Sequence, residues 1–297
     1  DFVTGDKTAP IANPSAGKAE GGVSQLDVEN SLRFNNILMM FDTTAEGLKA
    51  ILEHGVAVLG NQGRFPQIGG VSFAFDKDLP AGSRITSMAL IDENGNVVAR
   101  LYEDGGFSDN LPAKISVVTL NFLAGNTTAP NGNETGGDGY PIRANGENFR
   151  YLLADGTLSA AVNETSNFTD ATVIANAVGS TGVMGEQRAF ELFMESNYAT
   201  PETAYDTADT DIANDTRIQN LDFRTDTVLE GKTIDGTTGD DPLVGTAGDD
   251  TINGLAGNDT ITATAGNASI DGGEGTDTLV IDAAAIASLS DMTLTSV

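Results

Sequence analysis

The first 229 residues mix helical and strand-like spacing of apolar positions. Helical spacing occurs in residues 43–56 and 185–198, and the second helix would turn Phe190 and Phe193 inward. Alternating or apolar strand patterns occur in residues 71–76, 85–92 and 96–102. Residues 114–124 begin as a strongly apolar run, which predicts a strand in the centre of a sheet. The mixture predicts an α+β fold in which helices pack on a mixed sheet.

Residues 236–280 follow a different period, of nine residues. The five units are GTTGDDPLV, GTAGDDTIN, GLAGNDTIT, ATAGNASID and GGEGTDTLV. Glycine lets the first six positions turn at positive φ, and the last three positions suit a short strand. The eighth position is always aliphatic and would point into a thin apolar core; its residues are Leu243, Ile252, Ile261, Ile270 and Leu279. The pattern resembles the RTX repeats, which bind calcium and fold as a short parallel β-roll.

Calcium prefers hard oxygen ligands, and the repeats carry carboxylates at fixed spacing. The candidate ligands, at the fifth and sixth positions, are Asp240, Asp241, Asp249, Asp250, Asp259 and Asp277. Each unit would form half a coil, so Asp241, Asp259 and Asp277 would line one edge of the roll. On the other edge Asp250 would be followed by Ala268, which has no carboxylate. We therefore expect a competent calcium file on the first edge and a weak or empty one on the second.

Charge narrows the classes of partner. The chain carries 43 acidic and 15 basic residues, a formal net charge of −28, which repels nucleic acid and anionic membrane surfaces. No cysteine is present, so thiol chemistry is excluded, and no apolar run approaches the roughly 18 residues needed to span a bilayer. The sequence begins at Asp1 without a visible signal peptide, so we expect it to be a piece of a longer protein.

A second resemblance rests on ordered motifs in residues 21–142. The motifs are LRFNN (32–36), LKAILEHGV (48–56), GRFPQIGGVSFAFD (63–76), PAGSRI (80–85), NFLA (121–124) and GGDGY (136–140). Together they resemble the C-terminal domain of the 5′-nucleotidase family, although Arg33 replaces the usual proline and eleven residues separate NFLA from GGDGY. GENF at 146 and residues 217–229 resemble the extended ending of large bacterial members.

The resemblance implies a nucleoside site. In this family two aromatic rings sandwich the base, and the matching residues are Phe34 and Phe122. The matching aspartate for the ribose hydroxyls is Asp138. Stacking on an aromatic ring contributes roughly 1–3 kcal/mol per base and tolerates any base. From the residues alone, Phe34 is more readily interpreted as a core residue, Phe122 at the end of an apolar strand is ambiguous, and Asp138 could be only a turn residue. Arg64 and Arg143 are weaker candidates for contacting phosphate.

The resemblance also implies what this chain lacks. The family's chemistry belongs to an N-terminal metallophosphoesterase domain with two divalent metals, whose site needs several histidines. This chain has one histidine, His54, which lies in the helix motif and is interpreted as structural. We therefore expect the chain to bind nucleoside or nucleotide but to be inactive alone.

These observations predict four parts: a recognition domain with a bacterial extension (1–229), a linker (230–235), the calcium-binding β-roll (236–281) and a tail (282–297). One hypothesis is the substrate-binding part of a 5′-nucleotidase or related phosphoesterase, exported by type I secretion and folded by calcium outside the cell or at its surface. The other is a non-enzymatic, calcium-stabilised surface, matrix or filament protein derived from that domain.

Overall fold

The structure is a computed structural model of the whole chain. It describes residues 10–60, 63–103, 105–125, 127–128, 134–204, 215–223, 229, 231–246, 248–263, 268–281 and 292–297. The chain crosses between two compact units: Asp1–Asp42 with Ser116–Ala208, and Thr43–Ile115 with Asp209–Val297. The predicted α+β class is confirmed, and a parallel β-roll follows it in the chain.

The first unit is built on a three-stranded sheet in the order β6 (Ile115–Leu120), β1 (Leu38–Thr43), β9 (Gly146–Tyr151). Its core is aromatic: the Phe149 ring lies 5.5 Å from the Phe41 ring and 4.8 Å from the Phe168 ring, centroid to centroid, and all three side chains are buried. The apolar run at 114–124 is a strand only to Leu120, and β6 lies at the edge of the sheet, so the prediction of a central strand was wrong.

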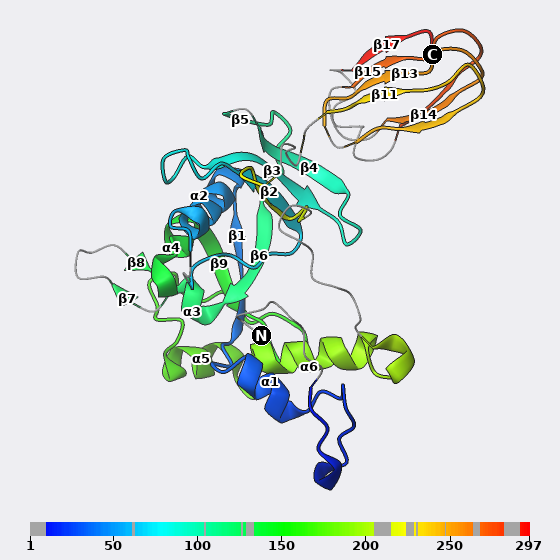
Figure 1. Cartoon of the computed structure of the whole chain (residues 1–297). Coiled ribbons are helices and arrows are strands. Elements are labelled where there is room, and N and C mark those ends of the chain that lie inside the picture. The colour runs from blue at the N-terminus through cyan, green and yellow to red at the C-terminus, as the bar shows by residue number, and fades with distance from the viewer. Residues whose placement is uncertain are drawn as a thin grey trace. The chain divides into compact units, whose positions relative to one another are not determined.

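Two helices of this unit, α1 (Gln25–Ser31) and α6 (Glu186–Asn197), lie alongside each other (Figure 1). Ser24 and Asp27 form a capping box that begins α1. The predicted helix at 185–198 is confirmed as α6, but the inward direction of its phenylalanines was wrong: Phe193 is 52% exposed and Phe190 is 37% exposed. The helix contacts α1 and the segment before β1 instead of packing over the sheet, so its period alone could not show which face is covered.

The second unit contains a five-stranded sheet in the order β10-β2-β3-β4-β5. Its strands are β10 (Ile218–Asn220), β2 (Val71–Phe75), β3 (Ile85–Ile91), β4 (Val97–Glu103) and β5 (Gly106–Phe107). Helix α2 (Ala45–Val56) is capped by the Thr44 hydroxyl, which accepts from the Gly47 N–H at 3.2 Å. The buried carboxylate of Glu53 on α2 accepts the N–H groups of Arg84 and Ile85 at 3.0 and 2.8 Å, which ties the helix to the start of β3.

The β-roll has two parallel sheets, in the orders β11-β13-β15-β17 and β12-β14-β16. Its strands are β11 (Thr233–Asp235), β12 (Pro242–Val244), β13 (Thr251–Asn253), β14 (Thr260–Ala263), β15 (Ser269–Asp271), β16 (Thr278–Ile281) and β17 (Thr293–Thr295). Paired residues are 18 apart, as Ile252 and Ile270 are, which confirms that each nonapeptide is half a coil. The eighth-position residues form the predicted core, joined by Ala263 and Ala268.

The roll extends beyond the predicted boundaries on both sides. Strand β11 comes from the segment 230–235 expected to be a linker, and β17 comes from the segment 282–297 expected to be a tail. Strand β11 keeps the 18-residue offset of the repeats, pairing Ile234 with Ile252. Strand β17 pairs at a longer offset of 24 residues, Ile270 with Leu294. The nine-residue motif misses these strands because the segments before them lack the glycine-aspartate turn that defines the repeat.

Candidate functional site: an aromatic platform and an aspartate-lined edge

Phe122 and the turn that carries Asp138 lie against each other in the first unit. Phe122 is on the short helix α3 (Asn121–Ala124), and its ring is 40% exposed. A Cβ atom added to Gly137 would lie only 2.2 Å from a ring carbon of Phe122, so the glycine backbone is seated directly on the ring. Asp138 follows, with its exposed side chain on a left-handed residue (φ 56°, ψ 15°). Non-glycine residues in this conformation are uncommon and gather at functional turns.

The eleven-residue segment between α3 and this turn does not separate them. Strands β7 (Thr127–Thr128) and β8 (Glu134–Thr135) pair antiparallel, so the two ends of the inserted segment lie beside each other. Its end at Gly136 packs on the backbone of α3, where an added Cβ would lie 1.7 Å from the Leu123 carbonyl oxygen. The insertion is therefore compatible with the proximity of Phe122 and the turn of Asp138.

A buried asparagine connects α3 to the start of β1. The Asn121 Oδ1 atom accepts from the Ile37 N–H at 3.0 Å, and the Asn121 N–H donates to the Ile37 carbonyl at 2.8 Å. Its Nδ2 donates to the carbonyl of Phe168 at 3.2 Å. Because Asn121 is 5% exposed and its amide is bonded on both sides, it fixes the backbone beside Phe122.

Phe34 lies in the loop between α1 and β1, three residues before Ile37, and its side chain is 86% exposed. The alternative interpretation of Phe34 as a core residue was therefore wrong. The next residue, Asn35, has a φ of 45°, a second left-handed non-glycine residue beside a predicted site position. Phe34 and Phe122 thus both have exposed rings. They lie on two chain segments that the hydrogen bonds between Asn121 and Ile37 hold together.

Arg143 and Arg64, the two weaker candidates for contacting phosphate, have different surroundings. The Arg143 guanidinium donates to the carbonyls of Gly125, Glu164 and Ser166 and lies 4.1 Å from the centroid of the Phe168 ring. These contacts favour a structural role for Arg143 over a contact with phosphate. Arg64 is half-buried in the other unit.

Along one edge of the roll, the sixth-position aspartates make the same hydrogen bond from one coil to the next. Oδ1 of Asp259 accepts from the Asp241 N–H at 2.9 Å, and Oδ1 of Asp277 accepts from the Asp259 N–H at 2.8 Å. The Oδ2 atoms of Asp259 and Asp277 are buried, with no hydrogen-bond partner among the described residues. A Cβ on Gly254 would lie 2.5 Å from Oδ2 of Asp259 and 2.3 Å from the Gly272 carbonyl oxygen, so two oxygens share a space that only glycine leaves open.

These residues fit calcium. A buried carboxylate oxygen without a donor is costly, and a hard cation that takes oxygen ligands removes that cost. Asp241, Asp259 and Asp277 would supply the carboxylates. Within the described ranges no three acidic or histidine side chains converge on one point, so backbone carbonyls would complete the coordination. Bound calcium would neutralise this edge and stabilise the folded roll.

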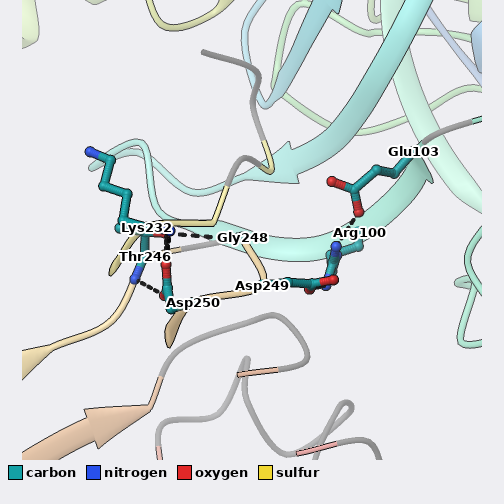
Figure 2. Close-up of polar contacts among 7 residues, drawn as sticks. All are labelled: Arg100, Glu103, Lys232, Thr246, Gly248, Asp249 and Asp250. Atoms are coloured by element: carbon teal, nitrogen blue, oxygen red, sulfur yellow. Dashed lines mark hydrogen bonds and ion pairs between the residues drawn. The ribbon is translucent and has the colours of Figure 1, made fainter. Parts of the chain in front are cut away.

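The opposite edge is organised differently. Oδ1 of Asp250 accepts from the Lys232 N–H at 2.7 Å, and the Thr246 N–H and hydroxyl also donate to this carboxylate (Figure 2). Asp250 is 2% exposed, and both of its oxygens have donors. The corresponding Ala268 lies in the apolar core. This arrangement favours a structural role for Asp250.

The fifth-position aspartates have protein partners too. Asp249 forms an ion pair of 2.6 Å with Arg100 of β4, which also pairs with Glu103 (Figure 2). Oδ1 of Asp240 accepts from the Asn258 N–H at 2.7 Å. Both contacts favour structural roles over calcium ligation.

Comparison with known proteins gives two family matches. Residues 7–126 match the 5′-nucleotidase C-terminal domain, and residues 235–270 and 256–280 match the RTX calcium-binding nonapeptide repeat. The two matches support a 5′-nucleotidase-type C-terminal domain followed by RTX calcium-binding repeats. Phe34 and Phe122 lie inside the match of the 5′-nucleotidase C-terminal domain, whereas Asp138 lies beyond its end.

Two curated proteins resemble part of this chain. The trifunctional nucleotide phosphoesterase protein YfkN of Bacillus subtilis is 28% identical over 141 residues, 46% of this chain and 8% of that protein. Protein 5NUC of Lutzomyia longipalpis is 30% identical over 96 residues, 31% of this chain and 16% of that protein. The chain thus matches less than a fifth of the length of either relative.

Solved structures give related matches. A 5′-nucleotidase precursor from Thermus thermophilus aligns with a TM-score of 0.38 and 24% identity, over 68% of this chain and 28% of that one. The NAD nucleotidase NadN of Haemophilus influenzae aligns with a TM-score of 0.39 and 17% identity, over 68% and 27%. Among the described residues, no helix combines the length and apolarity required to cross a membrane.

Proposed function

We propose that this chain is the nucleoside-recognition part of a secreted nucleotide phosphoesterase. One observation carries the proposal: Gly137 seats the turn of Asp138 directly on the ring of Phe122. This places a stacking surface next to a carboxylate, and both are exposed enough to meet a ligand. The family match over residues 7–126 and the nucleotide phosphoesterase among the relatives support the same assignment.

In this proposal the base stacks between Phe34 and Phe122. Stacking contributes roughly 1–3 kcal/mol per base and does not select one base, so the site would accept several nucleosides. Asp138 accepts hydrogen bonds from the ribose hydroxyls, because an ionised carboxylate has four lone-pair positions and no proton to donate. The left-handed backbone at Asp138 holds the carboxylate in this position before the ligand arrives.

Hydrolysis of the phosphate would require the two-metal centre of a metallophosphoesterase domain N-terminal to this segment in the parent protein. Two metals polarise the phosphoryl group and activate water. The residues of this chain would hold the nucleoside so that its 5′-phosphate enters that centre, a positioning role.

The acidic roll suits export. Its carboxylates repel one another where calcium is scarce, and calcium outside the cell would convert binding into folding free energy. RTX repeats are typical of secreted proteins, and we place the parent protein outside the cell or at its surface. Extracellular calcium modules bind in the range of about 10⁻⁴–10⁻³ M. A roll that is fully folded in excess chelator would contradict this proposal.

Calorimetric titration of the chain with adenosine tests the recognition role. Phe122→Ala should weaken adenosine binding roughly 5- to 100-fold, by loss of one stacking contact. Phe193→Ala is the matched control, because Phe193 is also an exposed phenylalanine (52%) of the same unit and should leave affinity unchanged. 2′,3′-Dideoxyadenosine should bind more weakly than adenosine to the wild type but equally well to Asp138→Ala. Absence of adenosine binding at millimolar concentration would refute the proposal. It would favour the alternative of a non-enzymatic, calcium-stabilised surface, matrix or filament protein.

A further inference from the structure

The loop that carries Phe34, residues 32–36, is held by the beginning of α6. Oε1 of Glu186 accepts from the Asn36 N–H at 2.9 Å and lies 3.3 Å from its Nδ2. In return the Glu186 N–H donates to the Asn36 carbonyl at 2.8 Å. One residue of α6 therefore satisfies both backbone groups of the residue that ends the loop.

The neighbours of Glu186 hold the rest of this loop. Nε2 of Gln187 donates to the carbonyl of Leu32 at 2.8 Å, and the Gln187 N–H lies 3.4 Å from Oδ1 of Asn35. A Cβ atom on Gly185 would lie only 2.5 Å from that same Oδ1, so a larger residue here would displace the Asn35 side chain. Three consecutive residues thus contact both ends and the middle of the loop, 150 or more residues away in the chain.

These contacts leave the largest side chain of the loop uncovered. The ring of Phe34 is 86% exposed, so the loop is not anchored by burial of its largest apolar side chain. Asn35 is kept at a φ of 45°, a conformation that usually needs support from surrounding contacts. If the loop already holds an exposed aromatic residue in one place, binding of a stacking ligand loses less conformational entropy.

We propose that Gly185, Glu186 and Gln187 form a positioning segment that sets Phe34 for stacking on a nucleobase. This inference rests on the proposed function. The segment lies outside the matched 5′-nucleotidase domain of residues 7–126, so it adds to the recognition site a part that the domain match does not include. Its residues act through Phe34 and do not touch the nucleoside.

The first experiment measures the loop without any ligand. The chain contains no tryptophan, so Phe34→Trp introduces a single fluorescent reporter at the tip of the loop. Adding Glu186→Ala should lower the fluorescence anisotropy of this reporter, whereas Glu186→Gln, which keeps Oε1 as an acceptor, should restore it. Glu195→Ala is the control on the same helix, because its side chain is 67% exposed. An anisotropy unchanged by Glu186→Ala overturns the proposal.

The second experiment uses adenosine titration of the full chain. Glu186→Ala should weaken binding about 2- to 10-fold, since ordering one side chain on binding is costly. In the Phe34→Ala background the same change should have no further effect, because the two residues act as a unit. An equal loss in both backgrounds overturns the positioning role. If the wild type binds no adenosine, the proposed function fails, and the anisotropy series still decides whether α6 orders the loop.

Discussion

The two edges of the roll should respond in opposite ways to the same chemical change, aspartate to asparagine. At Asp259 the substitution keeps the oxygen that accepts from the Asp241 N–H and replaces the buried, unpartnered Oδ2 by an amide. A buried charged oxygen without a donor costs about 1–3 kcal/mol or more. In excess chelator Asp259→Asn should therefore leave the free energy of unfolding of the roll unchanged or raise it.

Calcium should reverse this result. At a calcium concentration about 100 times its dissociation constant, binding adds about 2.7 kcal/mol of stability per site. Asp259 is the central aspartate of the edge, bonded to Asp241 and to Asp277, so its loss should remove most of that gain. Far-ultraviolet circular dichroism during thermal unfolding, with and without calcium, measures both quantities.

The matched control is Asp250→Asn on the other edge. Both oxygens of Asp250 already accept from Lys232 and Thr246, so an amide nitrogen would face a donor and cost about 1–3 kcal/mol. That loss should be the same with and without calcium. A calcium-specific loss at Asp250, or equal losses in both conditions at Asp259, would refute the assignment of the edges.

Three other changes have defined outcomes. Gly137→Ala should displace the exposed ring of Phe122 and weaken adenosine affinity, with little change in melting temperature; unaltered affinity would count against the platform. Arg100→Ala and Asp249→Ala should show a coupling energy of up to about 1 kcal/mol in a double-mutant cycle of unfolding, smaller in high salt because Asp249 is half-exposed; a coupling of zero at low salt would show that the pair contributes nothing. Burial raises the pKa of Tyr151 to about 12, above its ordinary value of 10.0. The stability that this shift contributes is therefore complete below pH 10 and is lost as pH rises toward 12. The free energy of unfolding should fall less steeply at alkaline pH in Tyr151→Phe, and an identical pH profile would contradict the shift.

The spacing of residues along the chain predicted the repeats well, but it predicted the surroundings of Phe34 and Phe122 only in part. The period of nine fixes the inward position of Ile252 and Ile261, because a half-coil leaves no other place for an aliphatic side chain. The same rule misses β11 and β17, which lack the glycine-aspartate turn. Ordered motifs singled out Phe34 and Phe122, and both side chains are exposed, although Phe34 taken alone is more readily interpreted as a core residue.

The contacts that support the platform were beyond sequence reasoning because they join distant segments. Glu186 bonds to Asn36 across 150 residues, and no periodicity in either segment signals the pairing. Arg143 illustrates the same limit: an arginine near a nucleotide motif suggested phosphate binding, whereas its guanidinium donates to the backbone carbonyls of Gly125 and Ser166, which lie in two separate segments.

The register of 18 residues in the roll has a consequence for how such an array can evolve. Gain or loss of a single unit would move every later unit to the opposite side, so aspartates that line one edge would exchange places with the residues of the other. Recombination between repeats therefore preserves the pattern only in steps of two units. In this roll one edge is lined by aspartates and the other is interrupted at Ala268. Such a difference between the edges persists only if units are gained or lost in pairs.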